Sequence, residues 1–184
     1  MDHTAARMKP AAEGPLEPAP DLAKDSVAEI SNGLRRLLAD VFALYLKTKN
    51  FHWHMNGRNF RDFHLLLDEH ATQIFAMTDD IAERARKMGG TTIHSVSDIS
   101  KHQRLKDNNE EIVEPFAMLH ELCTDNRELT RFLRTMHETC ENGQDVATAS
   151  MIEVWIDQTE RRAWLLSEIT GDRDEQPTSV RKTR

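Results

Sequence analysis

Five side chains that can bind a metal recur at regular spacings between residues 52 and 83. They are His52, His64, Asp68, Asp79 and Glu83, separated by 12, 4, 11 and 4 residues. Imidazole and carboxylate groups without a thiolate suit hard or borderline ions such as iron, manganese or zinc. The sequence therefore indicates a metal site built from nitrogen and oxygen donors.

A single long helix carries four of these ligands. Between residues 59 and 88 no residue type breaks a helix, and apolar residues recur with the 3.6-residue period of an amphipathic helix. At ~100° per residue, the three acids lie roughly 40°, 60° and 100° around the helix from His64. The centre of the apolar stripe lies roughly 110–130° away. We therefore expect the ligands to form one stripe that points away from the bundle core.

Distance along this helix prevents one ion from binding all four side chains. The ligands form two pairs, each one turn apart: His64 with Asp68, and Asp79 with Glu83. Between the pairs the helix rises about 16 Å at ~1.5 Å per residue, whereas metal–ligand bonds are only ~2.0–2.6 Å long. Either each chain holds two half-built sites, or an antiparallel copy of the helix supplies the missing half across a two-fold axis.

Further helices are predicted on both sides of this one. Periodic apolar residues and turn signals favour long helices over about 26–55, 59–88, 109–140 and 145–169, with at most one short helix near 95–99. Pro115 either moves the start of the third long helix to about Glu114 or kinks it. The pattern predicts an all-α, ferritin-like four-helix bundle with a short extra helix between helices 2 and 3.

The bundle interior lacks one expected motif. Ferritin-type di-iron bundles direct a Glu-x-x-His motif inward, and in this sequence no Glu is followed by a His three residues later. We therefore do not expect a metal centre buried inside a single bundle. That leaves the subunit interface, in agreement with the outward-facing stripe.

Composition and charge set further bounds. The chain has 184 residues, a net charge of −7 and 30% charged residues, which fits one soluble, mildly acidic domain and argues against strong nucleic-acid binding by its body. We expect a proline-rich, disordered tail over 1–24, the bundle over 25–170 and a flexible tail over 171–184. With no apolar run of ~18 residues and no signal pattern, we expect a cytoplasmic protein with no membrane partner. Cys123 and Cys140 are expected to be buried and too far apart to pair.

The motif HWHMNG and the ligand spacing closely resemble the Dps family of miniferritins, the DNA-binding proteins of starved cells. The resemblance extends from about residue 26 to 169 and is strongest in KNFHWHMNG, FRDFHLLLDEH and DDIAERARKMGG. It implies a hollow shell of twelve chains that binds ferrous iron at two-fold interfaces, oxidises it preferentially with hydrogen peroxide and stores a ferric mineral. It also implies a site made of His52, His64 and Asp68 from one subunit and Asp79 and Glu83 from another.

The resemblance implies a ferroxidase that stores and detoxifies iron and so protects DNA from oxidative damage. Trp53 matches the family's tryptophan beside the site, where it either intercepts stray oxidant or simply packs the helix end. His54 and His70 lie near the ligands in the sequence but break the family spacing. Family members line a three-fold ion pore with acids, and the candidates for that role here are Asp125, Glu128 and Asp145.

The tails depart from the family pattern. Members that bind DNA tightly have flexible tails rich in Lys, whereas the N-terminal tail here is net acidic and the C-terminal tail is mixed in charge. With few basic residues to contact phosphates, we expect DNA binding that is weak and sensitive to salt, and an equally weak association with the nucleoid. Twelve copies of the tails in one shell would add avidity. The alternative function is a non-enzymatic nucleoid-packing shell whose metal only supports assembly.

Overall fold

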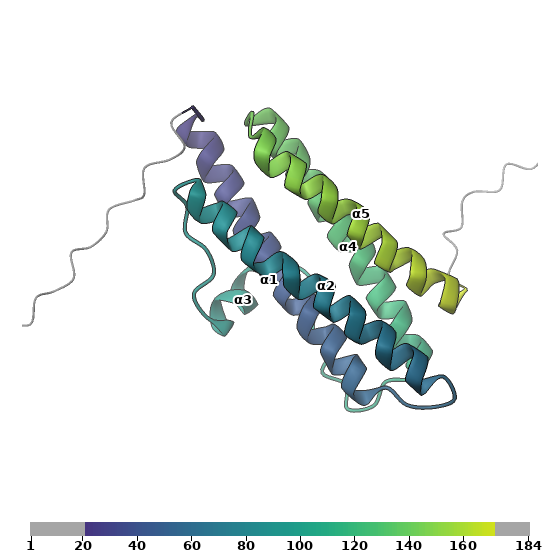
Figure 1. Ribbon diagram of the computed structural model, residues 1–184. Coiled ribbons are helices and arrows are strands. Elements are labelled where there is room, and N and C mark those ends of the chain that lie inside the picture. The colour runs from purple at the N-terminus through teal and green to yellow at the C-terminus, as the bar shows by residue number, and fades with distance from the viewer. Residues whose placement is uncertain (1–20, 172–184) are drawn as a thin grey trace, which may run out of the picture.

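Five helices make up the computed structural model, which describes residues 21–171. They are α1 (Lys24–His54), α2 (Phe60–Lys87), α3 (Val96–His102), α4 (Pro115–Asn142) and α5 (Val146–Thr170). Consecutive long helices form two hairpins, α1 with α2 and α4 with α5, which pack side by side with the short α3 against α1 (Figure 1). Within the described residues there is no strand. The predicted all-α, ferritin-like bundle with a short helix in the long connection is confirmed.

The helix ends follow from local sequence chemistry. Gly57 and Gly89, with φ of 90° and 87°, adopt the left-handed backbone beyond the ends of α1 and α2, which glycine reaches at no steric cost. Pro115 is the first residue of α4, and the Glu114 carboxylate accepts hydrogen bonds from the next two backbone amides. Of the two alternatives for Pro115, the structure therefore supports a helix start rather than a kink.

The core lies between the two hairpins. Apolar side chains at helical spacing from all four long helices are buried there, including Leu34, Leu67, Ile74, Leu129 and Ile152, all at 0% exposure. Cys123 and Cys140 are buried and form no disulfide, as expected. Burial raises the pKa of the Cys140 thiol to about 12.

The connection between α2 and α4 is attached to α1 by two carboxylates, one of them fully buried. Asp40, which is fully buried in α1, accepts hydrogen bonds from the Arg104 side chain and from the Leu105 amide at 3.1 Å. Arg35 of α1 donates to Asp98 of α3 at 2.8 Å. These contacts hold α3 and the following loop beside the outer face of α1, where they line a groove described below.

No helix among residues 21–171 is both long and apolar enough to cross a membrane. The predicted tails fall almost entirely on residues 1–20 and 172–184, which lie outside the described part of the chain. The N-terminal boundary differs slightly from the prediction because α1 already begins at Lys24.

Candidate metal centre

The first set of predicted ligands comes together where α1 and α2 cross. The imidazole rings of His52 and His64 stack with centroids 3.7 Å apart and planes inclined by 20°. Each Nδ1 lies within hydrogen-bond distance of the other residue's backbone carbonyl, at 2.8 Å for His52 and 2.9 Å for His64. A carbonyl can only accept, so both rings carry their proton on Nδ1. Each Nε2 is left with a lone pair for a metal ion.

Asp68 completes this set but is held by a lysine. Its Oδ1 lies 3.9 Å from Nε2 of His52 and accepts a 2.7 Å hydrogen bond from Nζ of Lys49. That hydrogen bond, with the charge of Lys49, holds the pKa of the exposed Asp68 carboxyl below its usual range. Lys49 also lies over the Trp53 ring, 5.9 Å from its centroid. The ammonium therefore occupies a position where a metal cation would meet the Asp68 carboxylate.

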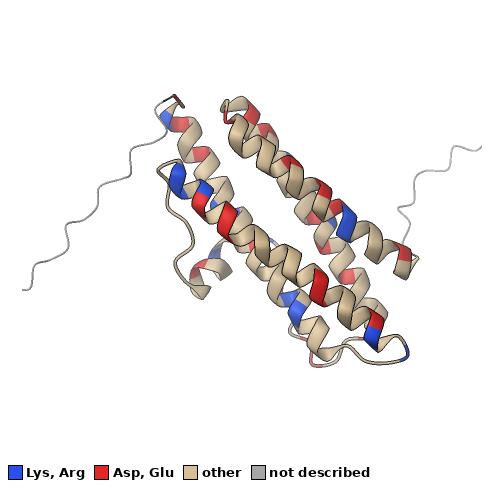
Figure 2. Ribbon diagram, viewed as in Figure 1, with Lys and Arg blue, Asp and Glu red and all other residues tan. Residues whose placement is uncertain are grey.

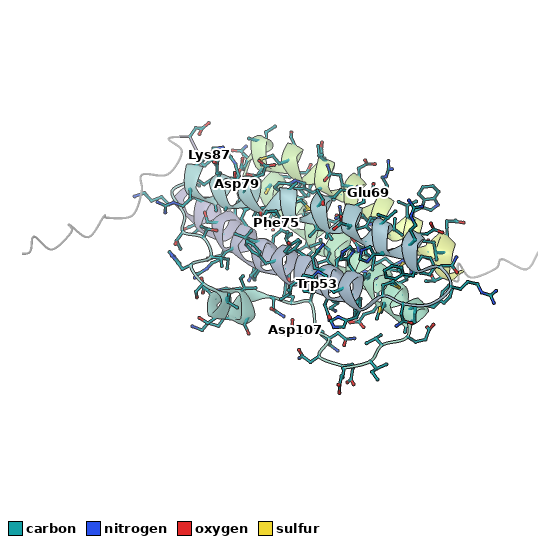
Figure 3. The ribbon with its side chains drawn as sticks, turned by 60° about the horizontal axis from the view of Figure 1, so that its bottom comes forward. Trp53, Glu69, Phe75, Asp79, Lys87 and Asp107 are labelled. Carbon is teal, nitrogen blue, oxygen red and sulfur yellow. The ribbon has the colours of Figure 1, made fainter. Side chains whose placement is uncertain are left out.

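The second set lies further along α2. Asp79 and Glu83 are both exposed, and the Glu83 carboxylate pairs with Lys87 at 3.0 Å. Figure 3 shows Asp79 some way from Trp53, the neighbour of His52, with Phe75 between them on the face formed by α1 and α2. Acidic residues recur along this exposed side of α2 (Figure 2). The outward orientation predicted for the stripe on α2 is thus observed for its three acids, whereas His64 is half-buried. His52, which belongs to α1, is buried at 8% exposure.

One copy of the chain does not assemble the whole set. Among residues 21–171, no group of three or more His, Cys, Asp or Glu side chains is arranged so that it could hold a metal ion. The structure brings His52, His64 and Asp68 into one region, and places Asp79 and Glu83 in another. The five residues stay predicted ligands.

Exposed apolar side chains surround both sets. Leu46, Trp53 and Phe75 are 59%, 60% and 51% exposed on the face of α1 and α2 that carries the ligands. Beside them a groove of about 780 Å³ runs between α1, α3 and the 103–110 loop, lined in part by Phe42, Leu46, Trp53, Val96 and Ile99. Exposed apolar area of this kind is typical of a surface that another protein covers.

The acids predicted to line a pore have partners within the chain. Asp125 is buried and accepts a 2.8 Å hydrogen bond from Lys47, although burial raises its pKa. Asp145 is buried at 3% exposure, caps α5 through the Thr148 amide and pairs with Arg84. Glu128 pairs with Arg131. These contacts explain why acids are placed there without invoking a pore, and pore lining stays a prediction.

The two extra histidines occupy different environments. His54 is exposed, and its Nδ1 lies 2.8 Å from the Asn50 carbonyl one turn earlier in α1. His70 is only 1% exposed and lies on the inner side of α2, where burial and the nearby Arg162 and Arg161 lower its pKa to about 4. Neither side chain joins the predicted ligand set.

Sequence reasoning missed Lys49. Its position three residues before His52 places it one helical turn away on the same side of α1, and that spacing was the available signal. The partner on α2 could be recognised only after the crossing of the two helices was known.

Comparison with known proteins places this geometry in a family. The family model of the ferritin-like domain matches residues 31–174. DNA protection during starvation protein 1 of Deinococcus radiodurans is 29% identical over 143 residues, covering 78% of this chain and 69% of the relative. An uncharacterized low temperature-induced protein of Nostoc is 33% identical over 138 residues, which cover 74% of this chain and 77% of that relative.

A solved structure gives the same result. The archaeal Dps homologue of Halobacterium salinarum superposes with a TM-score of 0.81 at 25% identity, covering 91% of this chain and 94% of that one. The helical order, the ligand spacing and these similarities agree. This chain belongs to the ferritin-like family and, within it, to the Dps proteins.

Proposed function

We propose that this protein oxidises ferrous iron with hydrogen peroxide at sites shared by two copies of the chain, and stores the ferric product inside a dodecameric shell. The observation that carries the proposal is the division of the five predicted donors into two separate parts of the α1–α2 face. His52, His64 and Asp68 lie together. Asp79 and Glu83 lie further along α2 and are exposed, ready to complete the site of a second copy.

The donor chemistry supports iron as the substrate. Imidazoles that can bind through Nε2, together with exposed carboxylates, suit ferrous iron, and the small number of donors leaves coordination positions open for an oxidant. Two ferrous ions side by side supply the two electrons that reduce one peroxide to two waters, with two protons taken up. Paired electron delivery avoids the one-electron step that releases hydroxyl radical. In this way the protein would protect DNA by removing both reagents.

The surface around the ligands supports pairing with a second copy. A two-fold axis across α1 and α2 would bring the group around His64 in one chain next to Asp79 and Glu83 of the other chain. The same axis would create two equal sites. The exposed Leu46, Trp53 and Phe75 would be covered at the same time. Binding of the ion would also require the Asp68 carboxylate to exchange its Lys49 partner for metal.

Three measurements test this proposal together. Light scattering should give the mass of about twelve chains, and anaerobic ferrous iron should be oxidised rapidly by peroxide and slowly by air. A monomer, or a large particle without rapid oxidation, would contradict the proposal. Gel shift of plasmid DNA should be weak and lost as salt rises. Strong plasmid binding by a particle without oxidation would instead support the nucleoid-packing alternative.

A further inference from the structure

A fully buried arginine lies in the bundle interior with only neutral partners. Arg162 of α5 is 0% exposed. Its Nε donates to Oδ1 of Asn126 and one terminal nitrogen donates to Oγ1 of Thr159, both at 2.9 Å. Its other terminal nitrogen, Nη1, is closed to solvent and has no hydrogen-bond partner. A buried guanidinium is a strong donor, and leaving one of its nitrogens unpaired is costly.

The two acceptors are fixed by their own hydrogen bonds. The Asn126 amide nitrogen donates to the Leu122 carbonyl at 2.8 Å, which directs its oxygen toward Arg162. The Thr159 hydroxyl donates to the Trp155 carbonyl at 2.6 Å, so only its lone pairs face the guanidinium. Neither group can supply negative charge, and neither is free to rotate toward Nη1.

A second unpaired nitrogen lies in the same region. His70 of α2 is 1% exposed, and its Nε2 is also closed to solvent without a partner. Arg84 of α2 donates to Thr148 of α5 at 2.7 Å, and the two helices run antiparallel (Figure 1). His70 lies 14 residues before Arg84, and Arg162 lies 14 residues after Thr148, so the two side chains are at the same level of the bundle between α2 and α5. Two helices therefore each contribute one unsatisfied nitrogen to a closed interior.

Other cations in the fold are treated differently. Lys47, 6% exposed, pairs with the carboxylates of Glu121 and Asp125, both at 2.8 Å. Arg84 pairs with Asp145, and Arg104 with Asp40. Arg162 has no carboxylate partner among the described residues, and burial alone lowers its pKa, to about 10. Among the described residues, no acidic side chain forms an ion pair with Arg162, so its positive charge is not offset.

We propose that Arg162 and His70 bind one small monovalent anion, chloride or an ion of similar size, inside the bundle between α2 and α5. The anion accepts hydrogen bonds from Nη1 of Arg162 and from Nε2 of His70 and offsets the buried positive charge. A water molecule would satisfy the nitrogens but not the charge. Because neither nitrogen is accessible to solvent, an ion that binds both must be small enough to be enclosed by the bundle. This inference does not depend on the proposed metal chemistry.

The direct test uses bromide as an anomalous scatterer that replaces chloride. Crystals of the full chain grown in sodium bromide should show one anomalous peak per chain in contact with Nη1 of Arg162 and Nε2 of His70. Arg162→Met should abolish the peak. Arg161→Met is the matched control, because Arg161 is the adjacent residue on α5 but is exposed, and this variant should keep the peak.

A measurement in solution covers the case in which Arg162→Met does not fold. At constant ionic strength, replacing gluconate by chloride should raise the unfolding temperature of the wild type and of Arg161→Met, since a ligand that binds only the folded state stabilises it. Absence of a bromide peak in well-ordered wild-type crystals, or non-anomalous density of a water at the site, would overturn the proposal. A thermal shift of zero in the wild type would also overturn it.

Discussion

The two faces of α2 carry histidines with opposite surroundings. His64 is half-buried where α1 and α2 cross, and its Nδ1 is fixed by the His52 carbonyl. The exposed carboxylate of Asp68 lies one turn further along the same face of α2. His70, six residues later, is enclosed in the bundle beside Arg162, and its pKa falls to about 4. The outer face thus favours cations and the inner face disfavours them. The same residue type has a different chemistry on each side because its neighbours set the local charge.

This difference supports the position proposed for the metal chemistry in this fold. Ferritin-type di-iron bundles place their metal ligands inside the bundle. Here the interior near His70 holds a guanidinium, which would repel a metal cation. The acids of α2 instead lie on the exposed side. A single helix therefore separates an outer region for cations from a positively charged interior.

The largest expected effect is a loss of oxidation rate when Asp79 of α2 is replaced, compared with replacement of its neighbour Asp80. Asp79→Ala should lower the initial rate of peroxide-driven ferrous oxidation more than about a hundredfold, because it removes a proposed ligand, and even residues that only support metal ligands are worth ~10–100-fold. Asp80→Ala is the matched control and should stay within about twofold. Stopped-flow absorbance of the ferric product measures both. Equal losses in the two variants would show that the stripe acts only through its total charge.

The inner face should respond in stability rather than in activity. Asn126→Ala removes an acceptor of the buried Arg162 and should lower the free energy of unfolding by about 2–3 kcal/mol, the cost of leaving a buried charged donor less satisfied. Thr124→Ala, an exposed change on the same helix, should cost less than about 0.5 kcal/mol. Denaturant unfolding measures the difference. A large loss of oxidation rate in folded Asn126→Ala particles of normal mass would contradict the separation between the two faces.

A smaller effect is expected where a lysine competes with metal on the outer face. Lys49→Met frees the Asp68 carboxylate and should tighten binding of Co²⁺, a redox-inert substitute, by a few-fold. Lys87→Met provides the comparison, because the Lys87–Glu83 pair is more exposed, with side chains 64% and 58% accessible, and should change the affinity less. Calorimetric titration gives both dissociation constants. Weaker binding in Lys49→Met would mean that the lysine holds Asp68 in place for the metal instead of competing with it.

The smallest change is expected from thiol reagents. Cys140 is buried and its pKa is about 12, so it should not react with an aromatic disulfide reagent at pH 8 until the protein is unfolded. Absorbance of the released thiolate should stay near zero in the native particle and reach two thiols per chain in denaturant. Rapid reaction in the native state would indicate an interior more open than the enclosed site of His70 and Arg162 requires.

Much of the fold could be predicted because it depends on local rules. Helical apolar spacing, Gly57 and Gly89 gave helix limits within a few residues of those observed. The Pro115 alternative needed the structure, since only the Glu114 cap shows that a helix begins there. The spacing of the five predicted ligands indicated that they divide into two separate parts, which is how the structure places these side chains, and their role as ligands stays a prediction.

The remaining features depend on contacts between helices, which sequence spacing does not encode. Arg161 and Arg162 are adjacent in TERRAWLL, yet one is exposed and the other is fully buried against Asn126. Similarly, Lys49 and Asp68 belong to different helices and meet only at their crossing.

The central claim is that each oxidation site is shared by two chains, and mixing two inactive variants tests it most directly. His64→Ala and Glu83→Ala homo-oligomers should each lack rapid oxidation, because every site has lost one ligand. In a mixed two-fold pair, one site carries both lesions and the other carries none. Particles reassembled from equal amounts of dissociated subunits should recover about a quarter of the wild-type rate, since about half the pairs are mixed and each has one intact site of two. Well-mixed particles that remain inactive would contradict the shared site.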